Sequence, residues 1–264
     1  MSGNHRHADY DQIARTYDRR YQRNSYAGVE QALRGFVGNR SGLQILEVGC
    51  GTGHWLGVLQ ASDFHPTGLD FSAGMLAQAK TRLPEIPLVR GTAERLPWQA
   101  GTYDRVFCIN AFHHFGDKAA FLAEARRSLR PGGMILIVGL DPHRRMDQWF
   151  IYDYFPESIE IDRERYPAAS TVRAWMGEAG FEDCATGEVE HWVYRLPIRE
   201  ILKQGRLDKR ATSQLSVLTD AEYARGMERI HADMARAEAR EETLFLAADL
   251  RLYATVGSSA QAGR

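Results

Sequence analysis

The chain has 264 residues, with 33 basic and 34 acidic side chains and a formal net charge of -1. This length fits one large α/β domain or one domain with insertions. The charge balance gives no general electrostatic footprint for nucleic acid. The three cysteines are far apart and form no C-x-x-C motif, which argues against a disulfide framework and predicts a reducing, cytoplasmic location. We expect neither a signal peptide nor a membrane span, because no apolar run is long enough.

The first patterned segment carries apolar and tyrosine side chains at helical spacing. Tyr10, Ile13, Ala14, Tyr17 and Tyr21 fall on one stripe, which predicts an N-terminal helix. Such a helix either closes over a bound ligand or packs on the core, and the pattern supports both.

A glycine-rich turn follows. An apolar run at residues 45–48 leads into glycines at alternate positions, Gly49, Gly51 and Gly53, and then into apolar residues at helical spacing. This order predicts a strand, a tight turn and a helix. Glycines remove Cβ and allow positive φ, so a ligand can lie against the backbone. The next strand is expected to end at Asp70, where a carboxylate can accept hydrogen bonds from a ribose diol.

Two cofactor classes use a glycine turn with an acidic partner on the next strand. A dinucleotide fingerprint requires G-x-G-x-x-G, but here the third glycine comes one position early and His54 stands where glycine is required. From Glu47 to Gly53 the segment reads Glu-x-Gly-x-Gly-x-Gly, which resembles the cofactor loop of the class I S-adenosylmethionine-dependent methyltransferases. A strand–helix turn without a ligand is the alternative.

The resemblance extends over about Tyr10 to Leu140. Its other elements are the Tyr-Asp repeat at residues 10–18, the segment Thr92-Ala93-Glu94, the two histidines after the strand at 103–110, and a helix, Arg-Pro-Gly-Gly turn and strand from Phe121 to Val138. It looks closest to the small-molecule methyltransferases that include the ubiquinone and menaquinone type. The family usually has Asp where Thr92 stands, so one carboxylate acceptor for the adenine is lost.

The segments at 181–194 and 244–256 are patterned as a terminal antiparallel strand pair. A helical insertion lies between them and contains a capping box that begins at Thr219. This insertion either folds back over the ligand edge of the sheet or forms an oligomer contact. The oligomeric state is left open, with a homodimer as one candidate.

Together the patterns and the resemblance predict one α/β methyltransferase domain over residues 1–264. The fold is expected to be a Rossmann-like seven-stranded sheet, mostly parallel with a terminal antiparallel strand, with helices on both faces. Its expected parts are an N-terminal helical cap (1–40), the cofactor-binding core (41–141), an aromatic lid (142–169), the rest of the core (170–194 and 243–257) and the helical insertion (195–242).

The resemblance implies S-adenosyl-L-methionine as cofactor and methyl transfer to a small molecule by in-line displacement, giving S-adenosylhomocysteine. The expected cofactor-binding residues are Tyr10, Tyr17, Glu47, Gly49, Cys50, Gly51, Gly53, Asp70, Phe71, Ser72, Met75, Thr92, Ala93, Glu94, Asn110 and Ala111. Among these, Asp70 is expected to bind the ribose hydroxyls and Glu47 to orient the turn and reach the methionine amino group through water.

His113 and His114 are the candidate base or substrate-positioning residues, because histidine titrates near physiological pH. Alternatively, one packs against the cofactor and the other is structural. A metal site with Asp141 and His143 is disfavoured, since adjacent histidines at a strand end point in different directions. We therefore expect no metal.

Residues 146–155 are rich in aromatics and form either a helix on the core or a lid over the substrate. The expected substrate contacts are His143, Trp149, Tyr152 and Tyr154. Asn110 does not begin the Asn/Asp-Pro-Pro-Tyr signature of amino-directed nucleic-acid methyltransferases, so a small molecule is the expected partner. Three alternatives stay open: a non-methylating enzyme that uses the same cofactor, an NAD-dependent oxidoreductase and a non-catalytic partner subunit.

Overall fold

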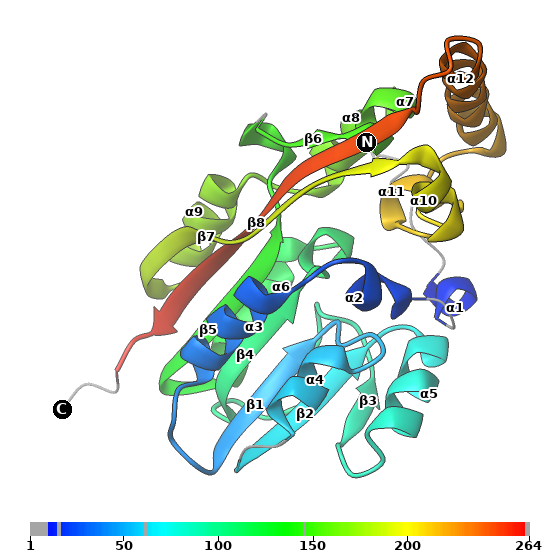
Figure 1. Ribbon diagram of the computed structural model, residues 1–264. Helices are drawn as coiled ribbons and strands as arrows, with labels where there is room; N and C mark the ends of the chain where they lie inside the picture. Colours follow the sequence, from blue (N-terminus) through cyan, green and yellow to red (C-terminus); the bar gives the residue numbers. More distant parts are fainter. Residues whose placement is uncertain (1–9, 15–16, 61–62, 145, 262–264) are drawn as a thin grey trace.

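A computed structural model describes residues 10–14, 17–60, 63–144 and 146–261. The strands are β1 (Leu43–Val48), β2 (Phe64–Asp70), β3 (Leu88–Arg90), β4 (Tyr103–Ile109), β5 (Leu129–Leu140), β6 (Gln148–Trp149), β7 (Phe181–Pro197) and β8 (Phe245–Ser259). They form one mixed sheet with the order β3-β2-β1-β4-β5-β8, in which β7 pairs with β8. The first five strands are parallel, and β7 and β8 are antiparallel additions (Figure 1). The predicted Rossmann-like architecture is confirmed.

The sheet has an eighth strand that the sequence did not predict. This strand, β6, has two residues and pairs with β8 at Asp249 and Ala248. The pairing of β5 with β8 ends at Leu140 and Leu252. The short strand β6 therefore takes the place of β5 beside the first residues of β8, beyond the point where β5 ends.

The described helices cover both faces of the sheet and the end of the terminal strand pair (Figure 1). They are α1 (Tyr10–Ile13), α2 (Arg19–Arg23), α3 (Ala27–Val37), α4 (His54–Leu59), α5 (Ala73–Arg82), α6 (Lys118–Ser128), α7 (Phe150–Tyr154), α8 (Pro156–Arg165), α9 (Ala169–Glu178), α10 (Ile198–Lys203), α11 (Ser213–Ser216) and α12 (Asp220–Glu238). Short 3-10 turns occupy Phe112–His114 and Pro142–Arg144. The stripe from Tyr10 to Tyr21, which predicts one helix, is divided between α1 and α2.

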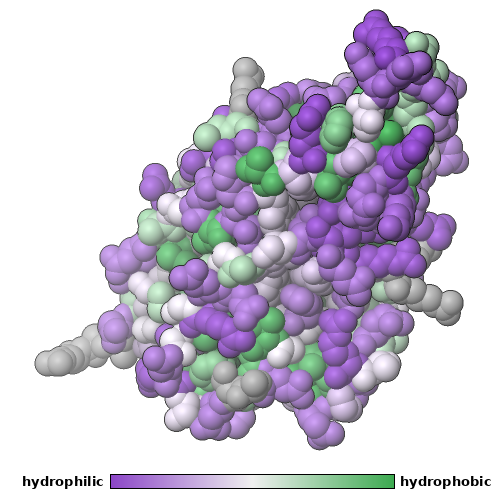
Figure 2. All heavy atoms as spheres, viewed as in Figure 1, coloured by the Kyte–Doolittle hydropathy of each residue, from purple (hydrophilic) through white to green (hydrophobic). Residues whose placement is uncertain are grey.

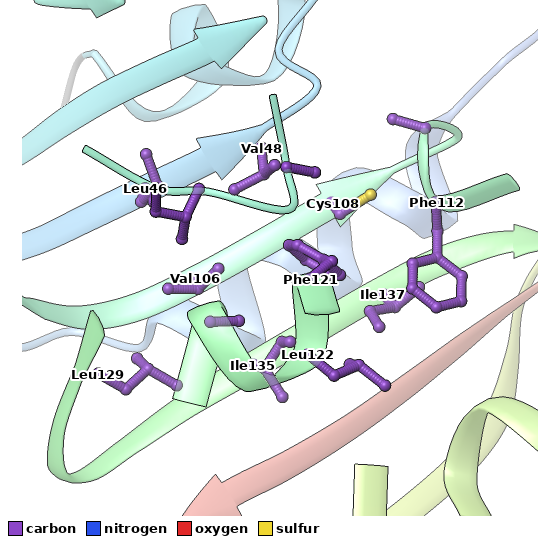
Figure 3. Close-up of a cluster of buried hydrophobic side chains, with 14 of the residues drawn as sticks. Leu46, Val48, Val106, Cys108, Phe112, Phe121, Leu122, Leu129, Ile135 and Ile137 are labelled. Atoms are coloured by element: carbon purple, nitrogen blue, oxygen red, sulfur yellow. The ribbon is translucent and has the colours of Figure 1, made fainter. Parts of the chain in front are cut away.

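The parallel half of the sheet is buried between two helical layers. On one face, Phe121 and Leu122 of α6 point toward Val106 of β4 and Ile135 of β5 (Figure 3). On the other face, α3 and α4 pack against β1, β4 and β5, with Phe107 fully buried there. Each such side chain contributes about 1.5–3 kcal/mol. This two-sided packing brings the carboxyl ends of the parallel strands to one edge, where ligands bind in open α/β sheets.

The terminal strands β7 and β8 form a long ribbon whose end carries α10, α11 and α12 (Figure 1). The predicted capping box at Thr219 begins α12 and is confirmed, since Glu222 N–H bonds to Thr219 Oγ1 and Thr219 N–H bonds to the Glu222 carboxylate. Helix α12 packs on α7, because Gly226 leaves room for the ring of Phe155. The helical insertion is thereby joined to the aromatic segment.

Figure 2 shows a mostly hydrophilic face on which apolar residues form small, separate patches. None of the described helices combines the length and apolar character needed to cross a bilayer.

Candidate active site

The glycine turn follows β1 with its glycines in the left-handed region. Gly49 has φ 76°, Gly51 has φ 53° and Gly53 has φ 75°. The amide of Gly49 donates to the carbonyl of Leu69 at 2.8 Å, which ties the turn to β2. A Cβ at Gly49 would lie 2.4 Å from the Cβ of Ala111, so this position requires glycine for both conformation and space.

Asp70 stands at the carboxyl end of β2 and holds the turn from the other side. Its carboxylate accepts the amide of Gly51 at 2.7 Å and the amide of Ser72 at 2.8 Å. Burial raises the pKa of Asp70, and these amide bonds oppose that rise. The same carboxylate therefore shapes the loop and faces the cavity beside it.

That first cavity has a volume of about 460 Å³, within the range of ligand sites for small molecules. The expected cofactor residues that line it are Tyr10, Tyr17, Gly49, Gly51, Asp70, Phe71, Ser72, Met75, Thr92, Ala93, Glu94, Asn110 and Ala111. The structure thus brings most of the expected set to one place. Six further residues, Asp11, Val48, Leu69, Gly91, His114 and Phe115, line it as well.

Three expected cofactor residues lie behind this wall instead. Cys50 is buried against Leu56, and a Cβ at Gly53 would meet the side chain of Leu83 at 2.9 Å. Both residues fix how the turn packs on its helices. Glu47 is 1% exposed, and its Oε2 has no hydrogen-bond partner among the described residues. Burial, followed by the charge of Asp70, raises the pKa of Glu47 well above its ordinary value.

The N-terminal segment covers the first cavity through the two aspartates of the Tyr-Asp repeat. The carboxylate of Asp11 accepts the Ser72 hydroxyl at 2.5 Å and the Gly74 amide at 2.8 Å, at the start of α5. Asp18 accepts the Thr52 hydroxyl and pairs with Arg82. The two aspartates therefore fasten α1 and the start of α2 to α4 and α5 at the rim of the cavity. Tyr10 and Tyr17 then line the cavity with their rings in an edge-to-face arrangement.

A second cavity of about 130 Å³ adjoins the first. Tyr10, Tyr17 and Asn110 line both. Asn110 follows β4 with φ 53°, an uncommon conformation for a residue other than glycine, and its amide donates to Val138. A ligand in one cavity and a ligand in the other would therefore lie next to each other beside these three side chains.

The two candidate histidines are distributed between the cavities. His114 lines the first, where its Nε2 is hydrogen bonded to the hydroxyl of Tyr10. His113 lines the second, is 7% exposed and stacks on the ring of Tyr166 at 3.8 Å. Burial, followed by the neighbouring His114, lowers the pKa of His113 well below 6.5, so its ring is neutral at physiological pH. Its Nε2 has no hydrogen-bond partner among the described residues.

Of the expected substrate residues, only Trp149 is among the described residues that line the second cavity. Tyr152 donates to Asp162 at 2.8 Å, Tyr154 donates to Asp233 at 2.6 Å, and His143 Nε2 lies 2.7 Å from the carbonyl oxygen of Tyr166. The structure therefore assigns these three side chains to contacts that hold α7, α8 and α12 in place. The aromatic segment is partly cavity wall and partly core.

Several residues of the second cavity were not expected from the sequence. They are Arg20, Arg23, Tyr26, Tyr166, Trp192, Tyr194, Arg206, Arg210 and Gln214, among others. Arg20 lies one helical turn after Tyr17, so the stripe itself contained a signal for it. The residues of the insertion carry no such local signal. Among the described residues, no three His, Cys, Asp or Glu side chains gather as metal ligands.

Comparisons with known proteins identify the family of this chain. A family model described as "Methyltransferase domain" matches residues 45–133. A demethylmenaquinone methyltransferase of Beutenbergia cavernae is 32% identical over 198 residues, which cover 65% of this chain and 80% of that protein. The chain belongs to the class I S-adenosylmethionine-dependent methyltransferases.

Other relatives match the chain over a smaller part. A phthiotriol/phenolphthiotriol dimycocerosates methyltransferase of Mycobacterium leprae is 41% identical over 140 residues, or 51% of each chain. The match thus spans about half the length of that relative. The solved structure of a putative methyltransferase from an antibiotic biosynthesis pathway of Anabaena variabilis superposes with a TM-score of 0.65 at 21% identity, covering 86% of this chain and 96% of that one. That likeness supports the fold.

Proposed function

We propose that this protein transfers a methyl group from S-adenosylmethionine to a small-molecule acceptor and releases S-adenosylhomocysteine. The observation that carries the proposal is the pair of adjoining cavities. The larger contains the glycine turn and Asp70, and the smaller contains His113 and an aromatic wall. A methyl donor and its acceptor need this arrangement, because the reacting groups must be held together and away from water.

The residues of the first cavity fit the proposed cofactor. Asp70 offers its carboxylate to the ribose hydroxyls, and the bare backbone of Gly49 and Gly51 allows close approach. Glu47 lies behind the wall of this cavity, and its buried Oε2, which has no hydrogen-bond partner among the described residues, would be compensated by the methionine ammonium through a bridging water.

Arg20 lines the second cavity beside Tyr17, a residue shared by both cavities, and supports the same assignment. None of the described residues that line the first cavity is Lys or Arg. The guanidinium of Arg20 donates to the hydroxyl of Tyr17 and lies 4.4 Å from the centre of its ring. Its Nε has no hydrogen-bond partner among the described residues. We therefore assign Arg20 to the methionine carboxylate.

The bound cofactor would supply a methyl group already activated by the sulfonium, so the protein needs few acid–base groups. His113 is neutral and buried at the second cavity, and it can accept a proton from an acceptor that must lose one. The hydrogen bond between His114 and Tyr10 would fix these two side chains against the cofactor in the first cavity.

A small molecule is the acceptor class that the features of this chain favour. The second cavity is ring-sized, and the net charge of -1 offers no general attraction for nucleic acid. Relatives are named for methylation of demethylmenaquinone and of phthiotriol dimycocerosates. The free cysteines fit a cytoplasmic location.

Calorimetry with S-adenosylhomocysteine tests cofactor binding, and NADH is the matched control ligand. We expect heat with the first compound and none with the second. The reverse result would favour an oxidoreductase, and no heat with either would favour a non-catalytic subunit. Incubation of candidate acceptors with methyl-labelled S-adenosylmethionine then tests transfer. Conversion of an acceptor without label in the product would replace methyl transfer by a non-methylating reaction.

A further inference from the structure

A third cavity adjoins the second. It has a volume of about 30 Å³, which is too small for a ring and large enough for about one water molecule. Three of the described residues line both the second and the third cavity, namely His113, Leu140 and Tyr166. Together they form a partition between the two spaces.

The rings of the partition are closely packed. His113 and Tyr166 stack with their ring centres 3.8 Å apart and their planes at 16°, and they are 7% and 5% exposed. The ring of His114 also packs against His113, with the centres 3.7 Å apart. In such dense packing the His113 ring has little room to move unless Tyr166 moves with it.

Tyr166 is held at both ends of its side chain. Its amide donates to the carbonyl of Asp162 at 2.8 Å, and its carbonyl oxygen accepts a hydrogen bond from His143 Nε2 at 2.7 Å. At the other end, Gln214 Nε2 donates to the Tyr166 hydroxyl at 3.4 Å. These partners come from α8, from the turn after β5 and from α11. A ligand could not push the ring aside without breaking some of these bonds.

Asp141 braces the chain on either side of the partition. It is 3% exposed, and its carboxylate accepts the amide of His143 at 3.2 Å and the amide of Ala169 at 3.0 Å. It thereby ties the end of β5, which bears Leu140, to the start of α9, which follows Tyr166. The partition is therefore a fixed wall.

The second cavity in front of this wall has the size of one ring. Its volume of about 130 Å³ is similar to that of cavities of about 150 Å³ that hold one benzene ring. Its lining also suits a flat apolar group, since it includes Trp149, Trp192, Leu250 and Leu252. Removing the ring of Tyr166 would join the second cavity to the third and add the space that the ring occupies.

We infer that the partition limits the part of the acceptor that enters the second cavity to the size of one ring, and that Tyr166 is the specificity-determining residue. This inference rests on the proposed function and names its substrate class. Acceptors that place two fused rings in this cavity are excluded by the wall.

The test compares phenol with 2-naphthol, which carry the same hydroxyl and differ by one fused ring. Both are neutral at pH 7, so charge does not distinguish them. NMR titrations use protein with saturating S-adenosylhomocysteine. Nuclear Overhauser contacts to the indole of Trp149 locate the probe, because Trp149 lines the second cavity and is not among the described residues that line the first.

In the wild-type protein the second ring should bring no gain. We expect naphthol to bind no more than about 3-fold more tightly than phenol at this position, although its larger apolar surface would favour it in an open pocket. A larger preference for naphthol in wild type would overturn the inference, because the wall would then not limit size.

Variants at two tyrosines locate the limit. Tyr166→Val removes the ring and should make naphthol bind at least ~10-fold more tightly than phenol, because the second ring would then bury further apolar surface. Tyr166→Phe keeps the ring and should keep the wild-type ratio. Tyr253→Val is the matched control, since Tyr253 is buried and lines the third cavity but is not among the described residues that line the second. An unchanged ratio in Tyr166→Val, or an equal rise in Tyr253→Val, would contradict the assignment.

A second variant covers the case in which Tyr166→Val does not fold. Leu140→Ala shortens another member of the partition and should raise the ratio of naphthol to phenol affinity by at least about 3-fold over wild type. A gain in binding of the larger probe cannot result from loss of folded protein. An unchanged ratio in this variant would overturn the inference.

A separate titration with S-adenosylhomocysteine keeps the two proposals apart. We expect its affinity to stay within about 3-fold of wild type in each variant, since neither Tyr166 nor Leu140 is among the described residues that line the first cavity. If this compound does not bind to wild type and the ratio at Trp149 still rises in Tyr166→Val, the proposed function fails and the size limit stands. If the compound binds and the ratio does not rise, the inference alone fails.

Discussion

At the scale of single residues, two carboxylates near the glycine turn have different surroundings. Asp70 is bonded to loop amides and faces the first cavity, whereas Glu47 lies behind it with one oxygen that has no hydrogen-bond partner among the described residues. Asp70 is expected to contact the ligand directly. Glu47 is expected to lower the stability of the folded protein near neutral pH and to strengthen ligand binding.

Replacing Asp70 by Ala should weaken binding of S-adenosylhomocysteine by about 1–3 kcal/mol, because ribose hydroxyls would lose a buried acceptor. Calorimetry measures this loss. Asp63→Ala is the matched control, since Asp63 is exposed and precedes the opposite end of the same strand. Equal affinities of the two variants would remove Asp70 from the site.

The raised pKa of Glu47 predicts a pH dependence of stability. The unfolded chain loses this proton near pH 4.5, while the folded chain keeps it to higher pH, so the contribution is complete below pH 4.5 and is lost as the pH rises through the folded pKa. Glu47→Gln does not titrate. Its free energy of unfolding should therefore rise relative to wild type by about 1 kcal/mol or more between pH 5 and pH 8.

Urea denaturation at the two pH values measures this difference, and Glu85→Gln, at an exposed position, is the control. The same Glu47→Gln protein should bind S-adenosylhomocysteine more weakly, because the neutral amide cannot compensate the ammonium. A variant that is less stable than wild type at pH 8 and binds normally would assign Glu47 a purely structural role.

At the scale of elements, the N-terminal cover depends on a few polar contacts. Asp11 meets the start of α5, and Asp18 meets Thr52 and Arg82. These contacts lie at the rim of the first cavity, so their loss is expected to ease the departure of a bound cofactor.

Asp11→Ala and Asp18→Ala should each increase the dissociation rate of S-adenosylhomocysteine several-fold, with a smaller effect on the association rate. Stopped-flow tryptophan fluorescence measures both rates, and Asp63→Ala again serves as control. Unchanged dissociation in both variants would show that the segment does not gate the ligand.

The elements also show what local pattern can predict. The strand–glycine–helix unit was predicted because its signals lie within a few residues, and Ser72, a residue type favoured at N-caps, accepts the amide of Met75 at the start of α5. Ser170 has the same residue type and precedes the apolar residues of α9, yet it does not cap that helix. Helix α9 begins at Ala169, and Ala168 occupies the N-cap without a side-chain bond.

At the scale of the whole molecule, the insertion is held by a close contact between helices. The Cβ that an alanine would add at Gly226 lies 2.1 Å from the ring of Phe155. Gly226→Ala should therefore lower the free energy of unfolding by about 1–3 kcal/mol, even though alanine favours helix.

Gly35→Ala is the matched control, because Gly35 is also helical and its added Cβ would meet nothing within 4 Å. This variant should gain about 0.5–1 kcal/mol. Thermal and urea denaturation compare the two proteins. An equal gain in both would mean that α12 is not seated on Phe155.

The insertion also marks the limit of prediction from sequence. Arg206 bonds to the carbonyl of Arg23, which lies 183 positions earlier, and no local pattern connects them. The alternatives of a cap or an oligomer contact stayed open for that reason. Arg206 and residues 210–214 line the second cavity, whereas α12 packs on α7 and contributes none of the described residues that line it.

The long β7–β8 ribbon suggests how related proteins could differ in the acceptor that they bind. Every described residue that lines the first cavity lies between positions 10 and 115, while many residues of the second cavity belong to the ribbon and to its tip. The helices of residues 198–244 pack on the aromatic segment and on β8 through Ile201, Leu215 and Ile230, and none of these residues is among the described residues that line the first cavity. Replacing residues 198–244 by the corresponding segment of a related protein should therefore change which acceptor is bound and leave binding of the methyl donor intact.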